Sequence, residues 1–260
     1  VKSESLALYQ NRNMDVAIDP APSEIEKEIG KLRENPELQE QRCTYNMSAP
    51  GPNYIENLRR IVQFSHDKTS KADLFQFIKN EYGLGESSAE TMLPFLKAGG
   101  LLEERERGIY YATKMSKAWV KTENQLDFIR IIHLKIKFVG EALYFAQEEI
   151  TRNQLYKISQ WYGLNVDKTR WICKFLLEAG LLEETRYLHL KTTSKGNAFA
   201  KTLPLNVLSE SILHEKGRLT PVAESSKPMI EDKWRKLNEA ATIPNAGGKI
   251  QGAELEEEVA

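Results

Sequence analysis

Cysteine and histidine are scarce in this chain. The two cysteines, Cys43 and Cys173, do not have the spacing of a metal or redox motif, and no pair of the four histidines has ligand spacing. Cys173 falls beside the apolar stripe of an expected helix, which predicts a buried thiol. We therefore expect no metal ion and no cofactor.

Long apolar runs are also missing. No stretch is long enough to span a bilayer, and Val1 to Gln10 lack the charged-then-apolar order of a secretory signal. These features predict a cytoplasmic protein with no membrane contact.

Catalytic motifs are absent as well. The sequence contains no phosphate-binding loop, no Gly-x-Ser-x-Gly and no His-Glu-x-x-His. Glu231-Asp232-Lys233 resembles part of a carboxylate-and-lysine nuclease site but lacks the preceding acidic residue. We expect no enzyme and no small-molecule substrate, while a partner or an absent domain could supply catalysis.

Neither sign of charge dominates. Lys and Arg number 36 and Asp and Glu 37, a formal net charge of -1, which argues against a purely electrostatic binder. The distribution is uneven, because residues 151–202 hold nine basic and four acidic residues, whereas residues 206–260 hold seven and ten. Such asymmetry is typical of a protein with one face toward nucleic acid.

What the chain does have is an internal repeat. Ala98-Gly99-Gly100-Leu101-Leu102-Glu103-Glu104 returns 80 positions later as Glu178-Ala179-Gly180-Leu181-Leu182-Glu183-Glu184. A fixed period indicates a structural unit that is built twice. The duplication covers roughly residues 53–122, the first repeat, and 126–205, the second repeat.

Each repeat predicts three helices followed by a β-hairpin. In the first repeat we expect helices that begin at Asn53, at Thr69 or Ser70, and at Ser87 or Ser88, with Pro94 bending or delaying the third. The hairpin strands are Leu101 to Arg105 and Ile109 to Ala112. In the second repeat we expect one long helix from about Asn124 to Gln147, caps at Thr151 or Asn153 and at Asp167, and strands over 181–185 and 187–190.

This series resembles winged-helix domains, a variant of the helix-turn-helix. The predicted fold is mainly α with small β-hairpins, as two tandem winged-helix domains with flexible tails. The expected parts are an N-terminal helical or extended arm (1–52), domain 1 (53–122), domain 2 (123–205) and an acidic, mostly irregular C-terminal tail with one short amphipathic helix (206–260).

One segment carries a closer resemblance. Residues 54–64, Tyr-Ile-Glu-Asn-Leu-Arg-Arg-Ile-Val-Gln-Phe, resemble a segment in the DNA-recognition region of type IIS restriction endonucleases. Those regions are built from successive winged-helix domains. The resemblance implies a recognition module without its nuclease domain, and no catalytic residue is carried over.

The third helix of a winged helix usually enters the major groove of DNA. Basic residues of the second repeat are therefore candidate contacts, although a solvated helix face with ordinary charges is the alternative. The first repeat places Glu86 and Glu90 where DNA would lie. This repeat is therefore either a weaker DNA-binding domain or a protein-binding surface. The candidate DNA contacts are Arg152, Lys168, Thr169, Arg170, Lys174, Arg186, Lys191 and Lys195 in the second repeat, and Ser87, Ser88, Arg105 and Arg107 in the first.

Two functions compete. The first is double-stranded DNA binding, as a specificity or regulatory subunit in restriction, phage defence, replication or transcription. The alternative is a protein–protein adaptor of a chromosome-partition or defence complex. Met229, Trp234 and Leu237 form an amphipathic stretch that predicts a protein partner bound through the tail. The aromatic residues Trp161, Tyr162, Trp171 and Phe175 predict packing in the core or between domains rather than base stacking.

Overall fold

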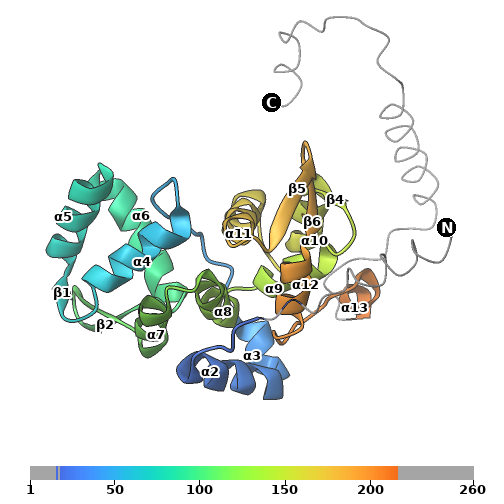
Figure 1. The fold of residues 1–260 in the computed structure, drawn as a ribbon, viewed down its shortest axis with the longest axis horizontal. Helices are drawn as coiled ribbons and strands as arrows, with labels where there is room; N and C mark the ends of the chain where they lie inside the picture. The colour runs from blue at the N-terminus through green and yellow to red at the C-terminus, as the bar shows by residue number, and fades with distance from the viewer. Residues whose placement is uncertain (1–15, 17, 216–260) are drawn as a thin grey trace, which may run out of the picture. The chain divides into compact units, whose positions relative to one another are not determined.

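The computed structural model describes residues 16 and 18–215. These residues are mainly helical and contain two small antiparallel sheets of three strands each (Figure 1). The mainly α class with small β-hairpins is confirmed, and each hairpin gains a short third strand that the sequence did not predict. The chain divides into two compact units, 1–208 and 209–260. The described part of the second unit holds one helix, α13 (Glu210–Glu215).

The two repeats contain the same series of elements. In the first repeat these are α4 (Tyr54–Phe64), β1 (Thr69–Ser70), α5 (Lys71–Tyr82), α6 (Glu86–Ala98), β2 (Leu102–Glu106), β3 (Ile109–Ala112) and α7 (Lys114–Thr122). In the second they are α8 (Gln125–Lys135), α9 (Val139–Phe145), β4 (Ile150–Thr151), α10 (Arg152–Gln160), α11 (Val166–Glu178), β5 (Leu182–Arg186), β6 (His189–Thr192) and α12 (Ser194–Ala200). The strand orders β1-β3-β2 and β4-β6-β5 correspond.

The repeated phrase forms the same turn twice. In both copies a glycine with positive φ, Gly100 (75°) or Gly180 (67°), ends the third helix. The carbonyl of that glycine accepts a 2.8 Å hydrogen bond from the hydroxyl of Thr113 or Thr193, the residue that caps the next helix. Both hairpins also have a register shift at equivalent positions. The duplication in sequence is therefore a duplication in structure.

The prediction of one long helix over 124–147 is wrong. The structure has two helices, α8 and α9, separated by Ile136 in an extended conformation and Phe138 at φ 70°. The N-terminal arm causes the break, because the Cys43 N–H donates to Lys135 O at 2.8 Å and the Lys137 N–H donates to Cys43 O at 2.9 Å. A distant strand-like contact thus overrides the local helical pattern.

The helix starts agree with the sequence in part. Ser70 caps α5, and Thr151 caps α10 in a capping box with Gln154, as predicted. Ser87 and Ser88 are not caps, because α6 already begins at Glu86 after Gly85. Asp167 is not a cap either, since the side chain of Asn165 accepts from Lys168 N at 3.0 Å.

Pro94 lies inside α6, and the bend or delay expected there stays a prediction. One helix start of the first repeat differs from the sequence-based prediction. Asn53 precedes α4 at φ 64°, but its side chain forms no capping hydrogen bond. The carboxylate of Glu178, at the end of α11 in the other repeat, instead accepts from the N–H groups of Tyr54 and Ile55, both at 2.8 Å.

An aromatic cluster joins the repeats. Phe175 of α11 lies 5.1 Å from Phe128 of α8 and 6.1 Å from Phe95 of α6, measured between ring centroids. Trp171 lies 5.3 Å from Tyr54, edge to face. Trp171 and Phe175 therefore pack against residues of the first repeat, which confirms for these two residues the prediction of core or inter-domain packing.

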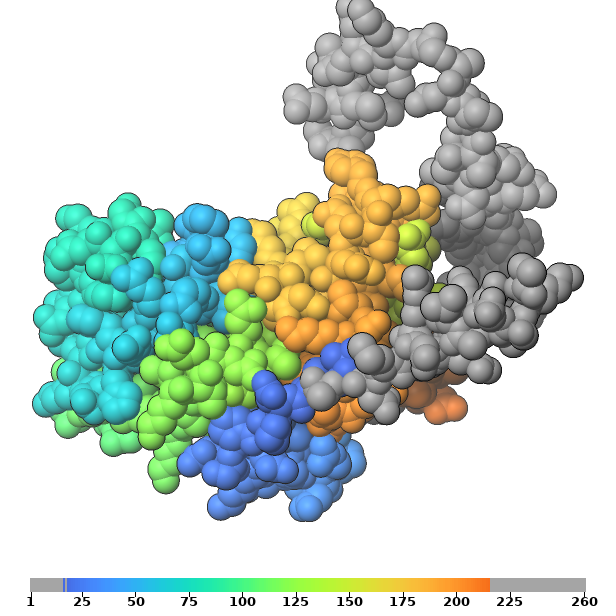
Figure 2. Space-filling view, viewed as in Figure 1, coloured from blue at the N-terminus to red at the C-terminus, as the bar shows by residue number. Residues whose placement is uncertain are grey.

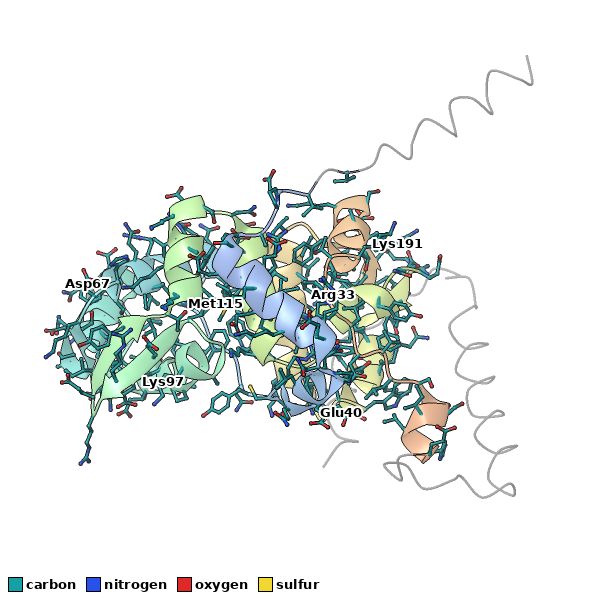
Figure 3. All side chains as sticks on the ribbon, turned by 90° about the horizontal axis from the view of Figure 1, so that it is seen from below. Arg33, Glu40, Asp67, Lys97, Met115 and Lys191 are labelled. Atoms are coloured by element: carbon teal, nitrogen blue, oxygen red, sulfur yellow. The ribbon has the colours of Figure 1, made fainter. Side chains whose placement is uncertain are left out.

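The N-terminal arm belongs to the same compact unit. It forms α2 (Ser23–Glu34) and α3 (Pro36–Gln41). Helix α2 buries Ile25, Ile29 and Leu32 and contacts α7 and α8, across which it lies in Figure 3. Arg33 donates to Thr202 O at 3.0 Å. The arm thus fastens elements of both repeats.

Candidate nucleic-acid interface

Five of the candidate basic side chains of the second repeat lie on α10, on α11 and on the hairpin. Arg152 begins α10, Lys168 and Arg170 lie in the first turns of α11, and Arg186 and Lys191 lie on the hairpin. A backbone hydrogen bond from Arg152 N to Leu188 O at 2.8 Å holds the start of α10 against the end of the hairpin. Capping by Thr151 and Asn165 fixes where α10 and α11 begin, and so fixes the position of these charges.

Each of the three arginines has a carboxylate partner. Arg152 pairs with Glu184 at 3.0 Å, Arg170 with Asp167 at 3.1 Å, and Arg186 with Glu149 at 2.8 Å. The side chains of Arg170 and Arg186 are 58% and 67% exposed. Exposed ion pairs contribute about 0–1 kcal/mol, so either guanidinium can exchange its carboxylate for a phosphate at low cost.

The structure corrects the prediction that Thr169 contacts DNA. It is fully buried, and its hydroxyl hydrogen-bonds with Ser159 Oγ at 2.6 Å and Asn165 O at 3.0 Å. The residue faces α10 rather than solvent, because it lies one position before the exposed Arg170 on the same helix. It therefore cannot contact DNA as expected.

Two of the candidate lysines have structural partners. Lys174 Nζ lies 4.2 Å from the centroid of the Trp171 ring and 5.2 Å from that of Tyr54, a cation–π contact between the repeats. Lys195 Nζ donates to Ala179 O at 2.9 Å, at the carboxyl end of α11. Lys168 is half-buried, and so is Lys191, which is labelled in Figure 3.

The equivalent surface of the first repeat is more acidic. Ser87 and Ser88 are exposed in the first turn of α6, beside the exposed Glu86 and Glu90. Arg105 forms an ion pair with Glu103, and its guanidinium lies 4.7 Å from the Tyr111 ring centroid. Arg107 is exposed at the hairpin turn.

An open cleft of about 800 Å³ lies beside α6. Lys71 pairs with Glu90 at 3.0 Å, and Lys97 pairs with Glu104 at 2.5 Å. The hydrogen bond to Glu90 raises the pKa of Lys71, and that to Glu104 raises the pKa of Lys97, so both amines stay charged. The lining residues are Tyr45, Lys71, Glu90, Leu93, Pro94, Lys97, Ala98 and Tyr110.

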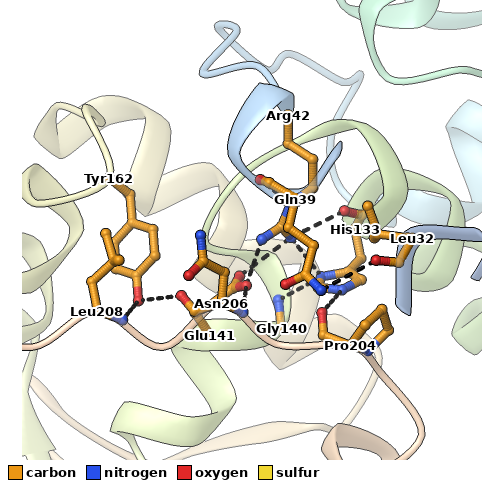
Figure 4. A network of polar contacts seen from close by, with 10 residues as sticks. All are labelled: Leu32, Gln39, Arg42, His133, Gly140, Glu141, Tyr162, Pro204, Asn206 and Leu208. Carbon is orange, nitrogen blue, oxygen red and sulfur yellow. Dashed lines mark hydrogen bonds and ion pairs between the residues drawn. The ribbon is translucent and has the colours of Figure 1, made fainter. Parts of the chain in front are cut away.

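A buried polar network fastens the second repeat to the arm (Figure 4). Arg42 and Glu141 form a fully buried ion pair at 2.6 Å, and Glu141 also accepts from Asn206 N at 3.0 Å. His133 accepts from Gly140 N at 3.2 Å and contacts Pro204 O at 3.0 Å. No short sequence pattern predicts this network, because its members come from distant segments.

The ionisation of the network follows from its burial. Burial and the adjacent Arg42 guanidinium lower the pKa of His133 to about 4, so the ring is neutral near pH 7. Burial alone would raise the pKa of Glu141, but the charge and hydrogen bonds of Arg42 hold it below its ordinary value. The network therefore joins Arg42 of the arm to α8, α9 and the segment after α12 through buried hydrogen bonds and one buried ion pair.

Among residues 16 and 18–215 no cluster of three or more His, Cys, Asp and Glu side chains could hold a metal ion. No helix in these ranges is long and apolar enough to cross a membrane. Burial raises the pKa of the Cys173 thiol to about 12, which keeps it protonated, as expected for a buried cysteine.

The predicted partner-binding residues Met229, Trp234 and Leu237 lie outside the described residues, as does Glu231-Asp232-Lys233. In comparisons with known proteins, the chain matches no family model, no curated protein and no solved structure.

Proposed function

We propose that this chain binds double-stranded DNA through the second of two tandem winged-helix domains. The observation that carries the proposal is the set of basic side chains on adjoining elements of the second repeat, within a segment that has five more basic than acidic residues (151–202). The order of three helices and a small sheet, found twice, supports the winged-helix interpretation.

In this proposal α11 enters the major groove by its first turns. Arg170 exchanges Asp167 for the acceptor edge of a guanine, which suits the fork of a guanidinium. Lys168, Arg186 and Lys191 bind phosphates and set the register of the domain on the duplex. Thr169, Lys174 and Lys195 contact other protein groups instead and hold α11 in place.

A fluorescence-anisotropy titration with a 30-bp duplex (a length chosen to span about three turns) tests this mode. The variant Lys168→Ala/Arg170→Ala should bind more weakly, and the slope of log affinity against log salt should fall by about 1, because Lys168 is the phosphate contact of the pair and Arg170 contacts a base. The matched control Lys114→Ala/Lys121→Ala removes the same charge from α7 and should bind like the wild type. Unchanged affinity and slope in the first variant would refute the mode.

The proposed biological role is that of a specificity or regulatory subunit in restriction, phage defence, replication or transcription. Any catalysis belongs to a partner or to a separate domain, because we assign no reacting group in this chain. Selection of bound sequences from random duplexes tests whether the chain reads sequence, since a reader yields a strong motif and a non-specific binder yields none.

A second candidate is a protein adaptor, favoured by the cleft and the acidic start of α6 in the first repeat. Lys71, Lys97 and Tyr110 line the cleft with Pro94, a mixture suited to a peptide that carries both acidic and apolar side chains. A stable co-purifying protein that is released by Lys71→Glu/Lys97→Glu, together with no duplex binding at low salt, would select this function over DNA binding.

A further inference from the structure

The ends of the two hairpins have the same backbone and different side chains. Gly108 in the first hairpin and Leu188 in the second are equivalent and have φ of 74° and 60°. The carboxylate of Glu104 accepts from Gly108 N at 2.8 Å, and that of Glu184 accepts from Leu188 N at 3.0 Å. The carbonyls of Gly108 and Leu188 each accept from the first residue of a helix, α5 or α10, at 2.9 and 2.8 Å.

Leucine is poorly suited to this backbone. Positive φ brings Cβ close to the backbone, so glycine is the common residue there and leucine is rare. Burial does not explain the exception, since Leu188 is 42% exposed. A strained residue that is also exposed points to a functional role for its side chain.

The neighbouring residue makes the tip apolar. Tyr187 is 84% exposed, the highest value among the exposed large hydrophobic side chains of the described chain. Arg186 precedes it and is also exposed, and Arg152 lies against Leu188 through its backbone N–H. Figure 2 shows the end of this hairpin projecting from the second repeat as an orange knob. The first hairpin ends instead in Arg107 and Gly108.

We propose that Tyr187 and Leu188 form an apolar wedge that enters the minor groove and partly separates one base step of the DNA bound by the second repeat. Apolar wedges act in this way in other minor-groove binders, where unstacking is offset by new contacts with the kinked duplex. Arg186 gives up Glu149 and binds the phosphate beside the opened step. This inference rests on the proposed function and adds a specific distortion of the DNA.

The flanking charges favour DNA over an apolar pocket of a protein. Arg186 and Arg152 bracket the tip. Glu184 already bonds both Leu188 N and Arg152, and Glu149 pairs with Arg186. A fixed tip suits this task, because its backbone is held by hydrogen bonds before DNA arrives.

The test uses the full chain and a 30-bp duplex of mixed sequence, chosen to span about three turns, with 2-aminopurine near its centre and a fluorophore at each end. Wild-type protein should raise 2-aminopurine fluorescence and shorten the end-to-end distance. The variant Tyr187→Ser/Leu188→Gly should lose both signals and bind about tenfold more weakly, the scale of one lost aromatic contact with a base. The slope of its log affinity against log salt concentration should stay unchanged, because the substitutions remove no charge.

The control variant Leu38→Ser/Tyr144→Ser removes the same two residue types from other exposed positions and should behave like the wild type. If the wedge variant binds as tightly as wild type, or wild type never unstacks the probe, the wedge is refuted while DNA binding stands. If wild type binds no duplex at low salt, the proposed function fails and the wedge fails with it.

Discussion

Replacing Gly196 with alanine should be strongly destabilising, and the reason lies in one close backbone contact. Gly196 is in α12, and a Cβ on it would lie 2.1 Å from the carbonyl oxygen of Leu181 and 2.7 Å from Thr192 Cγ2. That carbonyl cannot move freely, because it belongs to the repeated turn and accepts from Thr193 N at 3.0 Å.

The loss of stability in Gly196→Ala depends on how far α12 has to move. Relieving a contact of 2.1 Å requires α12 to shift away from the turn, and overpacking of this kind costs about 1–3 kcal/mol or more. Replacing glycine within a helix returns about 0.5–1 kcal/mol. The neighbour is backbone rather than a flexible side chain, so we expect a net loss near the upper end, about 2–3 kcal/mol.

The first repeat supplies the control. Its equivalent residue is Ser116, whose hydroxyl donates to the Leu101 carbonyl at 2.7 Å. Ser116→Ala removes the hydroxyl, which also accepts from Thr113 Oγ1 at 3.0 Å, and should cost about 1 kcal/mol. Urea denaturation followed by circular dichroism gives both values. A Gly196→Ala protein as stable as the wild type, or no less stable than Ser116→Ala, would refute the reasoning.

Three further predictions concern stability. Leu188→Gly should raise the free energy of unfolding by about 1 kcal/mol because it relieves a left-handed backbone, and Gly108→Leu should lower it by a similar amount; a lower value for Leu188→Gly in urea melts would contradict this. The pKa of His133 is lowered from 6.5 to about 4, so the unfolded chain binds its proton first and about 3 kcal/mol of stability should be lost as pH falls from about 6.5 to 4. His133→Gln should make the free energy of unfolding nearly constant between about pH 6.5 and 4. A variant with the same pH dependence as the wild type would contradict this role of His133. Glu178→Ala should cost about 1–2 kcal/mol by uncapping α4, whereas Glu178→Gln should retain part of that stability, and equal losses would show that its hydrogen bonds to Tyr54 and Ile55 do not matter.

The candidate interface could be predicted only in part. The exposed basic residues Arg170 and Arg186 follow from charge and from their places on a helix start and a hairpin. The prediction that Thr169 contacts DNA is wrong, because its position on α11 points its side chain to Ser159 and not to the surface that exposes Arg170. The cation–π contact of Lys174 with Tyr54 cannot be predicted from a local pattern, since Tyr54 belongs to the other repeat.

By itself the sequence determined the local structures of this protein. The glycines at the third-helix ends, the caps at Ser70 and Thr151 and the paired hairpins all depend on residues a few positions apart, so they can be read from short patterns. Only the tertiary structure decided the rest. It divided the stretch 124–147 into two helices by pairing Cys43 with Ile136, and it capped α4 with Glu178. These contacts join distant segments of the chain. They stabilise the observed structure by more than the preference of residues 124–147 for one continuous helix, which is all that a short sequence pattern can indicate.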